Sequence, residues 1–247
     1  MKILDEYFML FEGADDAKYR QRAIDVHGKI TKALVTDKSK VSNVVNVGDL
    51  LDDDSMKDLS VEFVRRAEDE KSKSDAKFVT NVNKKEKKIV LFVEVPAKAA
   101  NMSDDEWRKV LQKGSNIAKI MERTNGLFYH EFVHYMDFER APGTKKAFVD
   151  FTNKKRSGST TKADYFNDPL ESNAIIQQGL TQIEDYLTTV SKDKALKVIG
   201  KSPDDFFKLV LDLIPGNKHF TDKYKNKLKK RTASMWVDVM KKLGEKE

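Results

Sequence analysis

The spacing of apolar residues predicts β-strands within the first half of the chain. Between residues 59 and 95, apolar and polar residues alternate in short runs, which is the period of strands with one buried face. The runs lie at 61–63, 78–82 and 89–95. Polar residues 83–88 join the last two runs as a hairpin would, and Pro96 ends the third because proline has no N–H for a sheet hydrogen bond. We therefore predict a β-meander that ends in a hairpin.

The period changes to that of helices beyond the hairpin. Ser103 and Glu106 have the spacing of a capping box, and they open a predicted helix with Trp107 on its apolar face. A longer helical run covers 117–140, either continuous or restarted after Gly126.

The rest of the chain contains one polar segment and further helices. A Pro-Gly pair at 142–143 is expected to close the preceding helix, and the small polar residues 152–163 are typical of a surface loop. Order is expected to resume at 168–169. Amphipathic helices are then predicted at about 169–190, 203–213 and 223–243.

Together these elements predict an α+β fold, in which a small twisted antiparallel or mixed sheet packs on the 117–140 helix and a helical C-terminal half follows. We treat the 247 residues as a single domain, with residues 1–100 mainly β and residues 101–247 mainly helical. Residues 1–58 are the weak part of this prediction. They mix short apolar clusters with turn signals and offer only 41–47 as a candidate strand.

Composition narrows the chemistry that the chain can support. It has no cysteine, so a metal would have to be held by His, Asp or Glu. The net charge is +6, but 46 basic residues are interspersed with 40 acidic ones, which argues against a nucleic-acid partner. Acidic residues interrupt any signal-peptide core near the N-terminus, and no apolar run has the length of a membrane span. We therefore expect a cytoplasmic or particle-associated protein without a membrane partner.

The run His130-Glu131-Phe132-Val133-His134 carries the candidate chemistry. On a helix, residues four apart project from the same face, so the two histidines can bind one ion. Glu131 is rotated by about 100° from His130, which suits a general base that deprotonates a metal-activated water without binding the metal. The alternative is a buried helix on which these three side chains are satisfied by hydrogen bonds.

The motif resembles that of the HExxH zinc metallopeptidases, the zincins. The resemblance covers about residues 127–174, and it implies a zincin-like fold, one Zn²⁺ ion and endopeptidase activity. Asp137 and Arg140 stand where metzincins have a glycine and a third ligand histidine, so that branch does not fit. A gluzincin-like pattern does fit. Such enzymes take a glutamate ligand from a downstream helix, and Glu171, 37 residues after His134, occupies that place.

Glu171 also has a purely structural interpretation. It is the third residue of a predicted helix that Asp168 caps and Pro169 begins, so it could belong to a variant of the capping box. Other carboxylates compete with it for the role of third ligand. They are Asp164, Asp168 and Glu184.

The resemblance also implies an oxyanion donor. Tyr165, six residues before Glu171, corresponds to a tyrosine that lethal-factor-like zincins place shortly before the ligand glutamate. An ordinary amphipathic tyrosine at a helix entrance is the alternative. Weaker candidates are His219 and Tyr129, and we interpret His27 as a surface or hydrogen-bonded histidine.

One position departs from the thermolysin pattern. Ile175 occupies the place of the aspartate that supports a ligand histidine in that group. The supporting group is therefore unassigned, with Asp137 and Glu139 as candidates.

We therefore expect a zinc endopeptidase that acts on a protein or peptide. By the resemblance, the substrate binds in extended form along an edge strand of the 78–95 hairpin. The compact lysine-rich chain is similar in style to small bacteriophage zincins, which implies virion association and phage structural or host proteins as partners. The alternatives are a structural or assembly protein on a zincin scaffold and a basic nucleic-acid-binding module.

Overall fold

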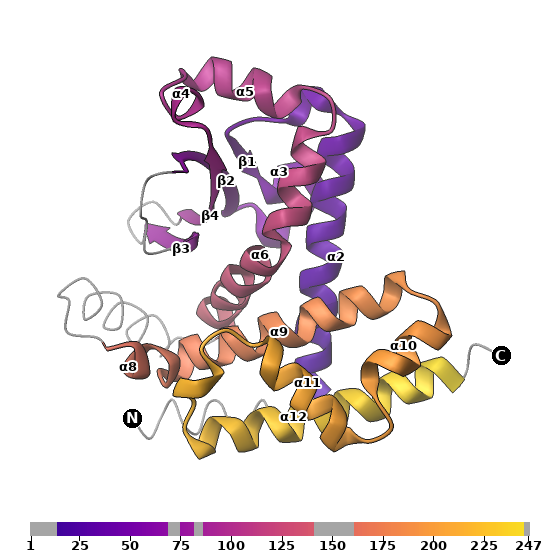
Figure 1. The fold of residues 1–247 in the computed structure, drawn as a ribbon. Helices are drawn as coiled ribbons and strands as arrows, with labels where there is room; N and C mark the ends of the chain where they lie inside the picture. Colours follow the sequence, from indigo (N-terminus) through magenta and orange to yellow (C-terminus); the bar gives the residue numbers. More distant parts are fainter. Residues whose placement is uncertain (1–13, 69–74, 82–85, 141–160, 245–247) are drawn as a thin grey trace. The chain divides into compact units, whose positions relative to one another are not determined.

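The computed structural model describes residues 14–68, 75–81, 86–140 and 161–244, which form an α+β fold with more helix than strand (Figure 1). The chain divides into two compact units. Residues 23–135 form one, here called the sheet unit, and residues 1–22 with 136–247 form the other, here called the helical unit. Within the described residues, no helix is long and apolar enough to cross a membrane.

The sheet unit contains a mixed four-stranded sheet with the order β1-β2-β4-β3. Its strands are β1 (Val44–Asn46), β2 (Leu59–Ala67), β3 (Ala76–Asn81) and β4 (Glu86–Val95). The β3–β4 hairpin is confirmed, whereas the meander is wrong because β4 lies between β2 and β3 and pairs with β2 in parallel. The consecutive residues Ile89, Val90 and Leu91 are all buried, so β4 is apolar on both faces and suits a central position.

Helix α2 (Ala14–Thr36) is the main element that the sequence did not predict. Its part within the sheet unit buries Ala23, Val26, Ile30 and Leu34, whose spacing is that of one helix face. Charged residues between these positions dilute the apolar signal. The weak N-terminal part of the prediction therefore contains a long helix as well as the short strand β1.

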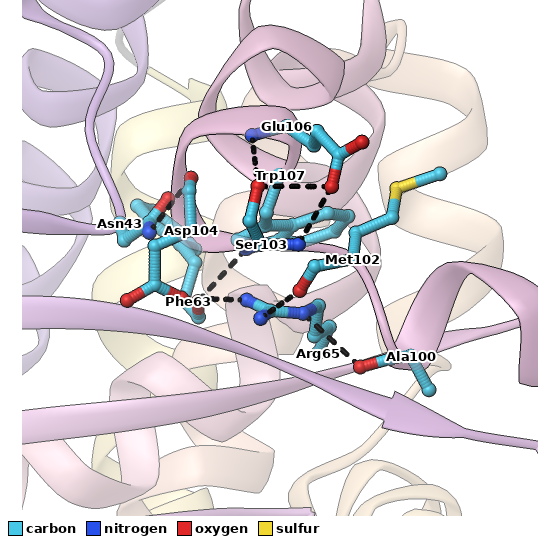
Figure 2. Close-up of polar contacts among 9 residues, drawn as sticks. All are labelled: Asn43, Phe63, Arg65, Ala100, Met102, Ser103, Asp104, Glu106 and Trp107. Atoms are coloured by element: carbon cyan, nitrogen blue, oxygen red, sulfur yellow. Dashed lines mark hydrogen bonds and ion pairs between the residues drawn. The ribbon is translucent and has the colours of Figure 1, made fainter.

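Two short helices follow β4 in the sheet unit: α4 (Ala97–Ala100) and α5 (Asp104–Gln112). Ser103 and Glu106 form the predicted capping box at the start of α5 (Figure 2). The backbone N–H and the hydroxyl of Ser103 both donate to the Glu106 carboxylate, and these bonds lower the pKa of Glu106 below its ordinary value. Trp107 is buried, and its Nε1–H donates to the Phe63 carbonyl at 3.0 Å. The hydrogen bond of Trp107 therefore joins the first turn of α5 to strand β2 of the sheet.

Arg65 fixes the connection between β4 and α5, as Figure 2 shows. Its guanidinium donates to the carbonyls of Ala100 and Met102 and to the Asp104 carboxylate. Asn43 donates to the Asp104 carbonyl at 3.1 Å from the other side. Residues distant in sequence thus satisfy the polar groups of this connection.

Helix α6 (Asn116–Arg140) is continuous through Gly126 and carries the His-Glu motif. In the sheet unit it buries Phe128 and Phe132, and the Tyr135 ring contacts the Phe78 ring of β3 at a centroid distance of 6.2 Å. The predicted packing of the motif helix on the sheet is thereby confirmed. The expected Pro-Gly stop at 142–143 lies outside the described residues.

The helical unit is built from α8 (Lys162–Phe166), α9 (Pro169–Thr189), α10 (Lys192–Ile199), α11 (Pro203–Leu213) and α12 (Asp222–Gly244), with the short 3-10 helix η3 (Asn217–His219). Its core joins apolar residues of α9 to α12, among them Ile176, Leu180, Phe206, Val210 and Leu228. The predicted helices α9, α11 and α12 are confirmed. The eight-residue α10 was not predicted, because so short a segment gives little periodic signal.

The predicted surface loop at 152–163 needs a partial correction. Thr161 is not part of a loop but the N-cap of α8, where it forms a capping box with Asp164. The capped helix α8 therefore begins before residue 168, where the sequence predicted the next ordered element. Residues 152–160 lie outside the described residues.

Candidate metal centre

Helix α6 brings the two motif histidines together. The Nε2 atoms of His130 and His134 are 3.1 Å apart, and both side chains are buried. Two nitrogen ligands of a tetrahedral zinc site, each about 2.0–2.1 Å from the metal, would be roughly 3.3 Å apart. The same distance permits a hydrogen bond between the rings, so the pair alone does not distinguish a metal site from a histidine pair.

Glu171 of α9 completes a group of three potential ligands. One ligand atom from each of His130, His134 and Glu171 lies within 4.8 Å of the others, and all three residues are buried. Two imidazoles and a carboxylate are the protein ligands of several catalytic zinc sites, which leave the fourth position open. The group can therefore hold a metal ion, and its donor atoms fit zinc.

The start of helix α9 involves the backbone of Glu171 in its cap. Asp168 caps α9 by accepting hydrogen bonds from the backbone N–H groups of Leu170 and Glu171. In a capping box, the N–H of Asp168 would donate to the Glu171 carboxylate. It donates instead to the Tyr165 carbonyl at 3.3 Å. Capping therefore employs the backbone of Glu171 and not its carboxylate.

The competing carboxylates have other roles in the structure. Asp164 accepts hydrogen bonds from the backbone and hydroxyl of Thr161, and Asp168 is the α9 cap. Glu184 is paired with Arg20 at 2.7 Å. These three carboxylates stabilise helix ends or compensate a buried cation.

Glu131 is buried and follows His130 directly on α6. It is not among the three residues of the potential ligand group. Its catalytic role is a prediction.

Tyr165 lies on α8, half-buried, with its ring perpendicular to that of Phe166 at 5.2 Å. Phe166 in turn stacks on His219, whose ring is 5.5 Å away and nearly parallel. Asn167 ties α8 to η3, because its amide donates to the His219 carbonyl and accepts from the N–H of Thr221. These contacts join α8 to η3 and to the residues that follow it. The role of Tyr165 as an oxyanion donor stays a prediction.

The remaining aromatic candidates are accounted for by packing in the sheet unit. His27 is buried, and its Nε2–H donates to the Met121 carbonyl at 3.2 Å. Its ring also contacts those of Phe128 and Tyr129. The interpretation of His27 as a hydrogen-bonded histidine is confirmed, and Tyr129 belongs to the same aromatic cluster.

The structure adds residues that the sequence did not nominate. Asn173 donates to the Asp137 carboxylate at 3.1 Å and accepts from Arg231 at 3.0 Å, and all three are buried. Asp137, a candidate for supporting a ligand histidine, thus has a partner on the helix that carries Glu171, while Glu139 is exposed. A faint signal exists, because Asn173 interrupts the apolar face of α9 beside Ala174. Nothing local points to Arg231.

Comparisons with known proteins assign no family to this chain. No protein-family model, curated protein or solved structure matches it. The candidate function therefore rests on the motif and on the geometry of its side chains.

Proposed function

We propose that this protein is a zinc-dependent endopeptidase. The observation that carries the proposal is the buried group of His130, His134 and Glu171, whose ligand atoms lie within 4.8 Å of one another. A zinc ion bound there would polarise the scissile carbonyl and acidify a water molecule. The resemblance of the motif to that of the zincins supports the same assignment.

The side chains divide the remaining work. The two histidines and Glu171 bind the metal, and Glu131 accepts a proton from the attacking water and passes it to the leaving amine. Tyr165 donates a hydrogen bond to the oxygen on which negative charge develops. The position of Glu131 supports its role, because this buried carboxylate follows a ligand histidine directly on the same helix.

The substrate class is proposed from the sheet. Strand β3 (Ala76–Asn81) stands at one end of the strand order, and its Phe78 contacts Tyr135 of the motif helix. An extended peptide added beside an edge strand would lie next to the helix that carries the site. We therefore propose an unfolded or extended segment of a protein as the substrate. A virion setting would make phage structural or host proteins the natural targets.

The test separates metal binding from catalysis. We expect the wild-type chain to bind one zinc ion and to cleave a labelled unfolded protein such as casein. Glu131→Gln should keep the zinc and lose roughly 10²–10⁴-fold in kcat, the range expected for a general base. Glu122→Gln, an exposed position on the same helix, is the matched control and should keep both properties.

Two outcomes would reject the proposal in different ways. Full activity of Glu131→Gln would remove the general-base role. Stoichiometric zinc without cleavage of any protein offered would favour a structural or assembly role for the metal-bound chain.

A further inference from the structure

Within the helical unit, three buried polar side chains form a hydrogen-bonded chain that links the last residues of α6 to helices α9 and α12. Asp137 belongs to α6, Asn173 to α9 and Arg231 to α12. Asn173 is the centre, since its Nδ2 donates to Asp137 at 3.1 Å and its Oδ1 accepts from Arg231 at 3.0 Å. Buried polar side chains of this kind are costly to leave without hydrogen bonds, so the chain constrains how the helices meet.

The charged groups on either side of Asn173 determine how its amide is oriented. A carboxylate only accepts hydrogen bonds and a guanidinium only donates them. The Asn173 amide must therefore point its NH₂ group to Asp137 and its carbonyl to Arg231. The flipped amide would place two acceptors together at one end and two donors at the other. One orientation of Asn173 is thus selected from both sides.

Two of the three hydrogen-bonded residues lie close in sequence to the potential metal ligands. Asp137 follows His134 by three residues on α6, and Asn173 follows Glu171 by two residues on α9. Residues two apart are about 200° apart around a helix, so Glu171 and Asn173 project from different sides of α9. A contact at each of these positions fixes the rotation of α9 about its axis, which a contact at Glu171 alone would leave free.

We infer that Asn173 is a positioning residue, which holds the Glu171 carboxylate toward His130 and His134 through its hydrogen bonds to Asp137 and Arg231. The inference rests on the metal site of the proposed function but not on peptidase activity. It gives Asp137 a role different from support of a ligand histidine. Its carboxylate anchors the helix that supplies the third ligand.

The experiment exchanges the two side chains of the Asp137–Asn173 bond. In Asn173→Asp, a new carboxylate faces Asp137, the hydrogen bond is lost and the like charges repel. In the double variant Asp137→Asn with Asn173→Asp, an amide on α6 can donate to a carboxylate on α9, which still accepts from Arg231. The double variant also has the net charge of the wild type.

The readout is the zinc dissociation constant of the folded protein, measured by competition with a chelator. We expect Asn173→Asp to weaken zinc binding by about 10–100-fold, the range typical of groups that orient ligands. The double variant should return to within about threefold of the wild type. The added negative charge of Asn173→Asp would by itself attract Zn²⁺, so weaker binding cannot be a charge effect. Gln182→Glu, an exposed position on α9, adds the same charge and should leave the constant unchanged.

Thermal unfolding of the metal-free proteins distinguishes positioning from simple stabilisation. A merely structural Asn173 would lower the melting temperature of Asn173→Asp and leave the zinc constant of the folded protein as in the wild type. If Asn173→Asp does not fold, Asn173→Gln keeps the amide but displaces it by one methylene, and it is expected to weaken zinc binding in the same direction.

The inference is overturned if the folded single variant binds zinc like the wild type, or if the double variant is as weak as the single one. Failure of the proposed function looks different. If the metal site does not exist, the wild-type chain binds no zinc; if only the peptidase activity is absent, the zinc constants of these variants keep the expected order.

Discussion

Two buried glutamates near opposite ends of helix α9 have different surroundings. Glu184 is paired with Arg20 at 2.7 Å and also has Lys242 at 3.5 Å. Glu171, in the first turn, lies with the two motif histidines, their ligand atoms within 4.8 Å of one another. A buried carboxylate needs compensating positive charge. The protein supplies cations to Glu184, whereas Glu171 has the helix N-terminus and a group of side chains suited to a metal ion.

The comparison teaches that burial of a glutamate does not by itself identify a metal ligand. From the sequence, both residues were candidates for the third ligand. The nature of the neighbours separates them, because guanidinium and ammonium groups repel a metal cation and imidazoles bind it. Substitutions at the two positions should therefore affect different properties of the protein.

The largest expected effect is on metal affinity. Glu171→Ala removes a ligand, so the zinc dissociation constant should rise by more than about 100-fold, beyond the effect of losing a group that only orients a ligand. Glu184→Ala is the matched control on the same helix and should leave the constant within about threefold. Chelator competition measures both. If Glu171→Ala and the wild type had equal zinc dissociation constants, Glu171 would not be a ligand, and it would not differ from Glu184 in this respect.

The second effect is on stability. Glu184→Gln keeps the shape of the side chain but leaves the buried Arg20 guanidinium without that carboxylate, and breaking such a pair costs about 3–5 kcal/mol. Denaturant unfolding of the metal-free protein should show this loss. A change below about 1 kcal/mol in the free energy of unfolding would show that the Arg20–Glu184 pair contributes little to stability.

A third prediction concerns the coupling of zinc to folding. Free zinc at 100 times its dissociation constant should stabilise the wild type by about 2.7 kcal/mol, because only the folded chain presents the assembled site. Glu184→Gln should show the same increment on a lower baseline, and Glu171→Ala should show less than about 0.4 kcal/mol at that zinc concentration. Calorimetric melting temperatures with and without zinc measure the difference. An increment in Glu171→Ala as large as that of the wild type would place the stabilising zinc elsewhere.

The smallest effect is expected at Lys242. Its side chain is 63 % exposed and its Nζ is 3.5 Å from Glu184, so water and salt screen the interaction. Lys242→Ala should therefore cost less than about 1 kcal/mol in the same unfolding assay. A loss as large as that of Glu184→Gln would show that Lys242, and not Arg20, compensates the buried charge.

The sequence predicted the parts of the fold that depend on neighbouring residues. The capping box of Ser103 and Glu106, the β3–β4 hairpin and helix α11 follow from patterns a few residues long. The parallel pairing of β2 with β4 did not, because strands brought together by a crossover leave no local signal. Helix α2 was missed because charged residues dilute its apolar stripe.

The same division holds at the candidate site. The sequence by itself determined that His130 and His134 share a helix face, since a spacing of four residues requires only the helical period. It could name Glu171 only through a resemblance, with Glu184 among the competitors. Tertiary structure separated the two, because it places Glu171 with the motif histidines and Glu184 with Arg20, and it alone assembled the hydrogen bonds of Asp137, Asn173 and Arg231. The physical reason is that these contacts join residues far apart in sequence, so they exist only after the helices have packed.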